Sequence, residues 1–206
     1  METYTINFVN KAGISGNFCV YQQAPNSLNP GVFPLVWLAQ FSDPDSKVKV
    51  SIGWNTQLYF VWAKTGKLKP GVIFNAGEAL KADVPESSAV TLTKSNGNYQ
   101  FIKQTKGYRR DMLEITSDEY TAIDQASVGI GMSGSGTFAV QAQPKMIFLF
   151  ETNAEYWITF GDLKQGQVLD PRFIINPERI VFPHGIYSMN VTYNWDYTWT
   201  IEQGLD

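Results

Sequence analysis

The fold is decided by residues 187–202, which read YSMNVTYNWDYTWTIE. Every odd-numbered position of this stretch is apolar or aromatic, and every even-numbered position is polar. Because successive side chains of a strand point to opposite faces, the alternation predicts a strand with one buried and one solvated face. At about 3.3 Å per residue the stretch would span about 50 Å, so we expect it to bend or break into two strands near residues 194–196.

The same alternation begins the chain. Tyr4, Ile6 and Phe8 mark a first strand, and residues 17–22 are interpreted as its hairpin partner. A further tight turn is predicted at residues 55–56, between two more alternating segments. We expect the odd positions of residues 187–202 to be buried against faces such as those of this first strand and of Phe138 and Val140.

The clearest hairpin joins residues 89–93 to residues 99–102, because the intervening Asn96 and Gly97 supply the positive φ angles of a type I′ turn. The segments of this kind number about ten to twelve, with turn signals between them. This pattern predicts an all-β fold, a single-domain antiparallel β-sandwich or flattened barrel that covers residues 1–206.

One short helix is expected over residues 117–125, where Thr116 and Glu119 have the spacing of a capping box. Burial of aromatic area normally stabilises a sheet, so we expect core positions for the tryptophans in the alternating strands. These are Trp54, Trp62, Trp195 and Trp199. Trp157 lies on the opposite strand face from its apolar neighbours, and it is the aromatic that we expect to be exposed.

The 206 residues are 44% hydrophobic and 17% charged, with a net charge of −3. This balance favours a folded globule and gives no overall attraction to nucleic acid or acidic membranes. Cys19 is the only cysteine, so an intrachain disulfide and a cysteine metal cluster are both excluded. We expect no cofactor and no metal.

The longest apolar run, residues 146–150, is far shorter than the roughly 20 residues of a spanning helix, so we expect a soluble protein without a membrane span. Residues 1–8 lack the basic and apolar segments of a secretory signal. The expected location is the cytoplasm, or outside the cell after export without a cleaved signal peptide.

The run Gly129 to Gly134 matches the dinucleotide-binding pattern G-x-G-x-x-G. That pattern binds a pyrophosphate only between a strand and a helix, and here a strand-like segment follows. A bulge or corner that feeds a central strand is therefore favoured. Ser133 with Asp162 or Asp170 and His184 has the chain order of a hydrolase triad, but the final glycine of G-x-S-x-G is missing.

A hydrolase remains an alternative through His184, the only histidine, or through a carboxylate pair among Glu151, Glu155 and Asp162. The only basic cluster consists of Lys103, Lys106, Arg109 and Arg110, with Tyr108 among them. It has the composition of a single-strand nucleic-acid site, but in an acidic protein a solvated loop is favoured, and no nucleic-acid partner is expected.

The favoured function is non-catalytic binding of a carbohydrate or cell-surface ligand by exposed aromatics and polar strand positions, since every catalytic motif is incomplete. The expected ligand-binding residues are Trp157, Tyr156, Glu155 and Asp162. A second alternative is a self-associating structural protein, a homo-oligomer.

Several segments together resemble the rhizosphere-induced RhiA proteins of soil bacteria. They are residues 17–22, residues 60–62 with 65–66 and 70–72, the run 129–134, and residues 156–161. The resemblance implies a bacterial protein that is made during plant-associated growth under quorum-sensing control. It implies no established biochemical activity and therefore supplies no catalytic residues.

Overall fold

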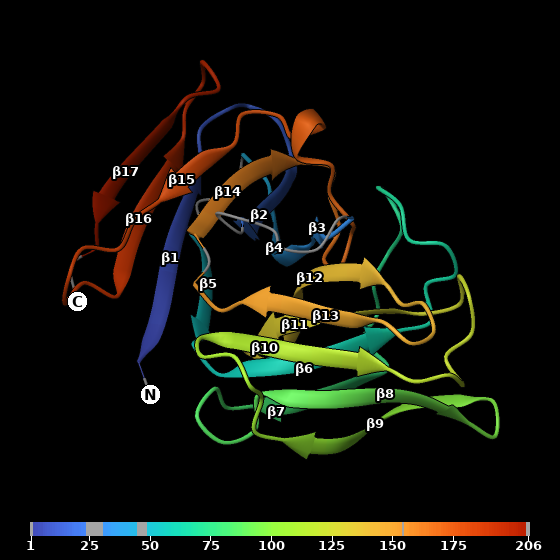
Figure 1. The fold of residues 1–206 in the computed structure, drawn as a ribbon. Helices are drawn as coiled ribbons and strands as arrows, with labels where there is room; N and C mark the ends of the chain where they lie inside the picture. The colour runs from blue at the N-terminus through green and yellow to red at the C-terminus, as the bar shows by residue number, and fades with distance from the viewer. Residues whose placement is uncertain (1, 24–30, 45–48, 154, 205–206) are drawn as a thin grey trace.

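The computed structural model describes residues 2–23, 31–44, 49–153 and 155–204. Nearly all regular structure in them is β-strand, arranged in four sheets that pack as two sandwiches (Figure 1). The all-β sandwich prediction is therefore confirmed, although the strands outnumber the expected ten to twelve. No helix in the described residues is long and apolar enough to cross a membrane.

The first sandwich consists of sheets I and II. Sheet I has the order β17 (Trp199–Gln203), β16 (Ser188–Tyr193), β1 (Thr3–Asn10), β5 (Val50–Asn55). Sheet II has the order β15 (Glu178–Ile180), β14 (Glu155–Gly161), β2 (Gly16–Gln23), β4 (Val36–Ser42). Their facing sides share one core, which includes Ile6, Phe8, Phe18, Val20, Ile158 and Val191.

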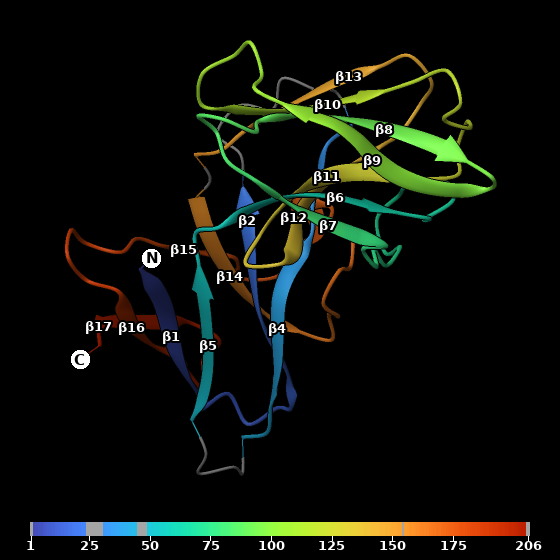
Figure 2. The same ribbon diagram turned by 90° about the horizontal axis from the view of Figure 1, so that it is seen from below.

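The second sandwich consists of sheets III and IV. Sheet III has the order β3 (Phe33–Pro34), β12 (Ser135–Gln141), β11 (Ser127–Met132), β6 (Leu58–Ala63), β7 (Glu78–Ala82). Sheet IV has the order β13 (Ile147–Glu151), β10 (Met112–Ser117), β8 (Ala89–Ser95), β9 (Asn98–Thr105). Their core includes Phe60, Leu92, Ile115, Val128, Phe138 and Val140. Figures 1 and 2 show the two sandwiches side by side. The single-domain expectation stays a prediction.

The alternating stretch breaks into β16 and β17, as predicted. Met189, Val191 and Tyr193 are buried, and β16 runs parallel to β1 with Val191 in register with Phe8. The expectation that Trp195 and Tyr197 are buried is wrong, because both lie in the turn between the strands and are 80% and 47% exposed. Alternation stops specifying burial where the strand ends.

The hairpin of β8 and β9 is confirmed, with φ angles of 49° at Asn96 and 80° at Gly97. The predicted hairpin of the first strand with residues 17–22 is wrong, because β1 and β2 lie in the two facing sheets of the first sandwich. At the predicted turn of residues 55–56, the amide of Gln57 donates a hydrogen bond of 3.0 Å to the side chain of Asn55, and the chain passes from β5 in the first sandwich to β6 in the second. Alternation predicts a strand and its buried face, but it does not identify the neighbouring strand.

The predicted helix over residues 117–125 is also wrong. Ser117 ends β10, and its amide donates to the carbonyl of Met146 in a strand-like arrangement. The carboxylate of Asp118 then accepts a hydrogen bond of 3.0 Å from the amide of Tyr120, which forms a tight turn. In the described residues, the sole helical piece is the 3₁₀ turn η1 (Pro171–Phe173).

The glycine run allows the backbones of β11 and β12 to approach each other closely. A Cβ at Gly129 would lie 1.8 Å from the carbonyl oxygen of Phe138, and one at Gly131 would lie 2.3 Å from that of Ser135. The register shifts between Ile130 and Gly131. The run is followed by a strand, as the bulge interpretation predicts, so the helix that a dinucleotide site requires is missing there.

Candidate binding site

After β14 the chain crosses the outer face of sheet II as an irregular stretch, residues 162–177, which we call the covering segment (Figure 1). Backbone hydrogen bonds tie it to β4: the amide of Val36 donates to Gln167, and the amide of Gly166 donates to Val36. Leucines of the segment pack on the sheet. The resulting apolar cluster includes Cys19, Tyr21, Val36, Trp157, Leu163, Leu169 and Ile174.

Gly166 fixes the path of the covering segment. Its φ angle is +80°, and a Cβ there would lie 2.7 Å from the carbonyl oxygen of Phe74. In the other direction, the carbonyl group of Gly166 accepts a hydrogen bond of 2.8 Å from the amide of Phe74. Glycine alone combines ready access to this positive φ with the lack of a Cβ, so it allows the segment to lie against the loop that follows β6.

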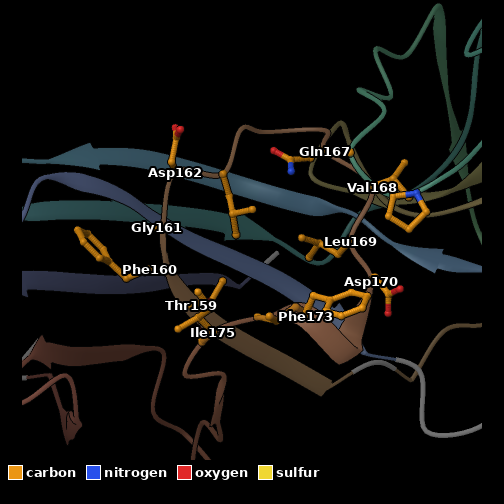
Figure 3. A pocket seen from close by; sticks show the side chains of 14 residues that line it. Thr159, Phe160, Gly161, Asp162, Gln167, Val168, Leu169, Asp170, Phe173 and Ile175 are labelled. Atoms are coloured by element: carbon orange, nitrogen blue, oxygen red, sulfur yellow. Dashed lines mark hydrogen bonds between the residues drawn. The ribbon is translucent and has the colours of Figure 1, made fainter.

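A pocket of about 320 Å³ lies between the covering segment, the end of β14 and residues 70–71 (Figure 3). Its lining is mainly apolar and includes Phe160, Leu163, Val168, Leu169, Phe173, Ile174 and Ile175. A mainly apolar hollow with a few polar groups at its rim is the usual form of a small-ligand site.

The polar groups of the pocket differ in their availability. The hydroxyl of buried Thr159 donates a hydrogen bond of 2.7 Å to the carbonyl of Ile175. The guanidinium of Arg172 donates bonds of 2.9 and 2.6 Å to the carboxylate of Asp170, which lowers the pKa of that carboxyl. Asp162 has no such partner in the described residues, and Figure 3 shows its carboxylate pointing away from the apolar lining.

Four large apolar side chains are exposed at this end of the first sandwich, two of them in the lining of the pocket, and we call the four the end patch. The exposed fractions are 80% for Trp195, 77% for Phe173, 71% for Ile175 and 47% for Tyr197. Two come from the covering segment and two from the turn between β16 and β17. Figure 1 shows η1 and this turn at the same end of the first sandwich.

Asn176 joins the two halves of the end patch. Its side-chain amide donates to the hydroxyl of Tyr193 at 3.2 Å and to the carbonyl of Tyr197 at 3.3 Å. Its carbonyl accepts a bond of 2.9 Å from the indole N–H of Trp199. The turn itself is fixed by Asp196, whose carboxylate accepts two bonds from Thr198, and these bonds lower the pKa of Asp196.

The structure separates the predicted ligand-binding residues. Tyr156 faces the core between sheets I and II, whereas Trp157 faces the covering segment and is half-buried, so the expectation that Trp157 is exposed is wrong. Glu155 forms an ion pair of 2.9 Å with Arg179 and accepts a bond of 3.3 Å from the indole of Trp157. Of the four, Asp162 is the one that lines the pocket.

Among the hydrolase candidates, the carboxylates at the two ends of β14 are not brought together either. Glu155 and Asp162 lie at opposite ends of β14, about 23 Å apart at the strand rise, whereas paired glycosidase carboxylates lie within about 5 to 10 Å. Glu151 belongs to sheet IV. His184 is exposed and has no hydrogen-bond or ion-pair partner in the part of the chain that the structure describes.

A family model described as RhiA matches residues 1–204. The chain belongs to the RhiA family. Protein RhiA of Rhizobium leguminosarum bv. viciae is 29% identical over 199 residues, which are 96% of this chain and 85% of that protein. No solved structure matches this RhiA-family chain.

Sequence reasoning missed two members of the end patch of this RhiA-family protein, Phe173 and Ile175, and assigned Trp195 and Tyr197 to the buried face of the alternating stretch. The usable signal for Trp195 was its place at the predicted break of the alternation. Phe173 and Ile175 follow Pro171 in a stretch without strand periodicity, which is a signal for an exposed loop. Within the described residues, no group of three or more His, Cys, Asp or Glu is placed to hold a metal.

Proposed function

We propose that this RhiA-family protein is a non-catalytic binding protein whose ligand is a carbohydrate, held at the end patch and the adjoining pocket. The observation that carries the proposal is the 80% exposure of Trp195, on a turn that a hydrogen bond from Asn176 ties to the covering segment, which lines the pocket. An aromatic side chain has few rotatable bonds, so it loses little conformational freedom when it binds a ligand.

The chemistry of the end patch fits a sugar ring. The C–H groups of a pyranose form a flat apolar face that stacks on an indole, while its hydroxyl groups need acceptors around the rim. The exposed carboxylates of Asp162, in the lining of the pocket, and of Asp196, in the turn, supply such acceptors. Trp157 has a supporting role, since it packs beneath the covering segment.

Exposure of this kind calls for an explanation beyond folding. A contiguous exposed apolar surface rimmed by polar groups generally marks an interaction site in a soluble protein. The plant-associated growth and quorum-sensing control that the family resemblance implies fit a carbohydrate ligand, because root and bacterial surfaces are rich in polysaccharides. Export from the cell would bring the protein to such a surface.

A glycan array tests the proposal. The wild type and a Tyr120→Ala control, which removes a 65% exposed aromatic from the second sandwich, should bind the same glycans. The double variant Phe173→Ala/Trp195→Ala should lose them, and Trp157→Ala should weaken binding by loosening the covering segment. Array binding that survives the double variant would overturn this site.

Self-association is the second candidate function, because a second copy of the chain would also cover the end patch. Light scattering over a concentration series separates the two. A carbohydrate-binding monomer keeps one mass throughout, whereas an oligomer that dissociates in Phe173→Ala/Trp195→Ala would assign the patch to self-association.

A further inference from the structure

The loop that joins β9 to β10 curls around a hollow of about 430 Å³, which Val84 and Pro85 close on the other side. Residues 106–111 line it, so it gathers most of the basic cluster that the sequence singled out. Lys103 lies earlier, within β9, and is not part of the lining.

Two anchors give the hollow a fixed shape. The amide of Gly107 donates a hydrogen bond of 3.0 Å to the hydroxyl of Ser88, a side chain that is only 1% exposed. At the other end, the amide and hydroxyl of Thr152 donate bonds of 3.4 and 3.1 Å to the carbonyl of Asp111. The start of the loop is thereby tied to the residue before β8, and its end is tied to the residue after β13.

Of the three cations of the hollow, one forms an ion pair with another described residue and two do not. Lys106 pairs with Glu86 at 3.8 Å. Arg109 and Arg110 are exposed neighbours, and in the part of the chain that the structure describes neither has a hydrogen bond or an ion pair. A guanidinium presents a planar fork of donors that matches a carboxylate in two parallel hydrogen bonds. The two arginines therefore offer an unused binding site for anions.

Tyr108 stands between these cations and is 99% exposed, so its ring contributes nothing to the core. An aromatic ring in this position can stack on the apolar face of a sugar while the neighbouring guanidinium holds a charged substituent. Free carboxylate receptors beside an exposed ring match a sugar that bears an acid group.

We propose that this hollow binds the carboxylates of an acidic saccharide. Single-stranded nucleic acid is the competing ligand, but its affinity depends on the number of phosphates neutralised, and two free cations on a chain of net charge −3 neutralise few. The hollow belongs to the second sandwich and shares no residue with the end patch, so binding at the hollow does not depend on the proposed function.

Calorimetry with polygalacturonate tests the site, and the fully methyl-esterified form of the same polymer serves as the neutral counterpart. The acidic form should bind, more weakly as salt is added, and the ester should not. Arg109→Ala/Arg110→Ala should weaken binding at least tenfold. Arg109→Lys/Arg110→Lys keeps the charge but loses the fork, and it should weaken binding several-fold.

The matched control is Lys67→Ala/Lys69→Ala, which removes the same charge from exposed positions outside the hollow and should leave binding unchanged. Several results would overturn the proposal. They are no binding of polygalacturonate, equal binding of its ester, an equal loss in the lysine control, or tighter binding of an oligothymidylate than of polygalacturonate. Trp195→Ala should have no effect on this binding, which separates the test from that of the end patch.

Discussion

The indole N–H of Trp199 donates a hydrogen bond of 2.9 Å to the backbone carbonyl of Asn176, so the last hairpin of the chain is tied to the covering segment. Asn176 returns two bonds from its side chain to the same hairpin. This small network is what sets the two halves of the end patch beside one another.

Replacing Asn176 therefore should cost stability. Asn176→Ala loses both side-chain bonds and places a Cβ residue at a φ of 47°, a conformation that asparagine tolerates better than alanine. We expect the free energy of unfolding to fall by about 1 to 3 kcal/mol, measured by urea denaturation. Asn176→Gly, which keeps the backbone freedom and loses only the bonds, should fall by less. Equal stability of all three proteins would contradict this role.

The sequence predicts a good deal of the fold, because period-two alternation depends only on burial. It identified the strands at both ends of residues 187–202 and the turn at Asn96 and Gly97. Beyond the hairpin of β8 and β9 it did not identify strand partners, since β1 and β16 pair although almost the whole chain separates them. Such pairing is decided by the packing of both sandwiches, which no local pattern records.

The candidate site was less predictable for a related reason. The pocket exists because the covering segment crosses sheet II, and the sequence of that segment shows neither strand nor helix periodicity. Asp162, which lines the pocket, was predicted because it follows a strand directly. Trp157 was misjudged because its strand face is not solvated but covered by the distant residues Leu163 and Ile174.

Gly129 should be among the least tolerant positions of the chain. In Gly129→Ala the new methyl group would meet the carbonyl of Phe138, and the close approach of β11 and β12 leaves it no room. We expect a loss of about 3 kcal/mol or more, or failure to fold. The control Gly53→Ala meets its nearest atoms at 3.6 and 3.7 Å and should change stability by less than about 0.5 kcal/mol. Thermal denaturation of the two variants checks this difference.

The thiol of Cys19 should not react with alkylating reagents in the native protein. Burial raises its pKa from 9.0 to about 12, so the reactive thiolate is suppressed at pH 8. Iodoacetamide should label it only after unfolding. Because the unfolded thiol releases its proton near pH 9 and the folded one does not, this group's contribution to stability should decline as the pH rises from 9 towards 12. Rapid labelling at pH 8 without denaturant would contradict the burial of Cys19.

Removal of a buried and of an exposed tryptophan should change the free energy of unfolding by very different amounts. Trp37 is fully buried and donates a bond of 2.9 Å to the carbonyl of Met132, so Trp37→Ala should cost about 3 to 5 kcal/mol. Trp195→Ala should change stability by less than about 0.5 kcal/mol, because its side chain packs on little. Urea denaturation measures both. A large loss in Trp195→Ala would mean that this residue serves the fold instead of a ligand.

The most direct test of the central claim is the dissociation constant of the best array glycan, measured by calorimetry for the wild type, Trp195→Ala and Tyr120→Ala. We predict binding about tenfold weaker in Trp195→Ala, the equivalent of about 1.4 kcal/mol, and unchanged binding in Tyr120→Ala. Equal dissociation constants for all three proteins would contradict carbohydrate binding at the end patch.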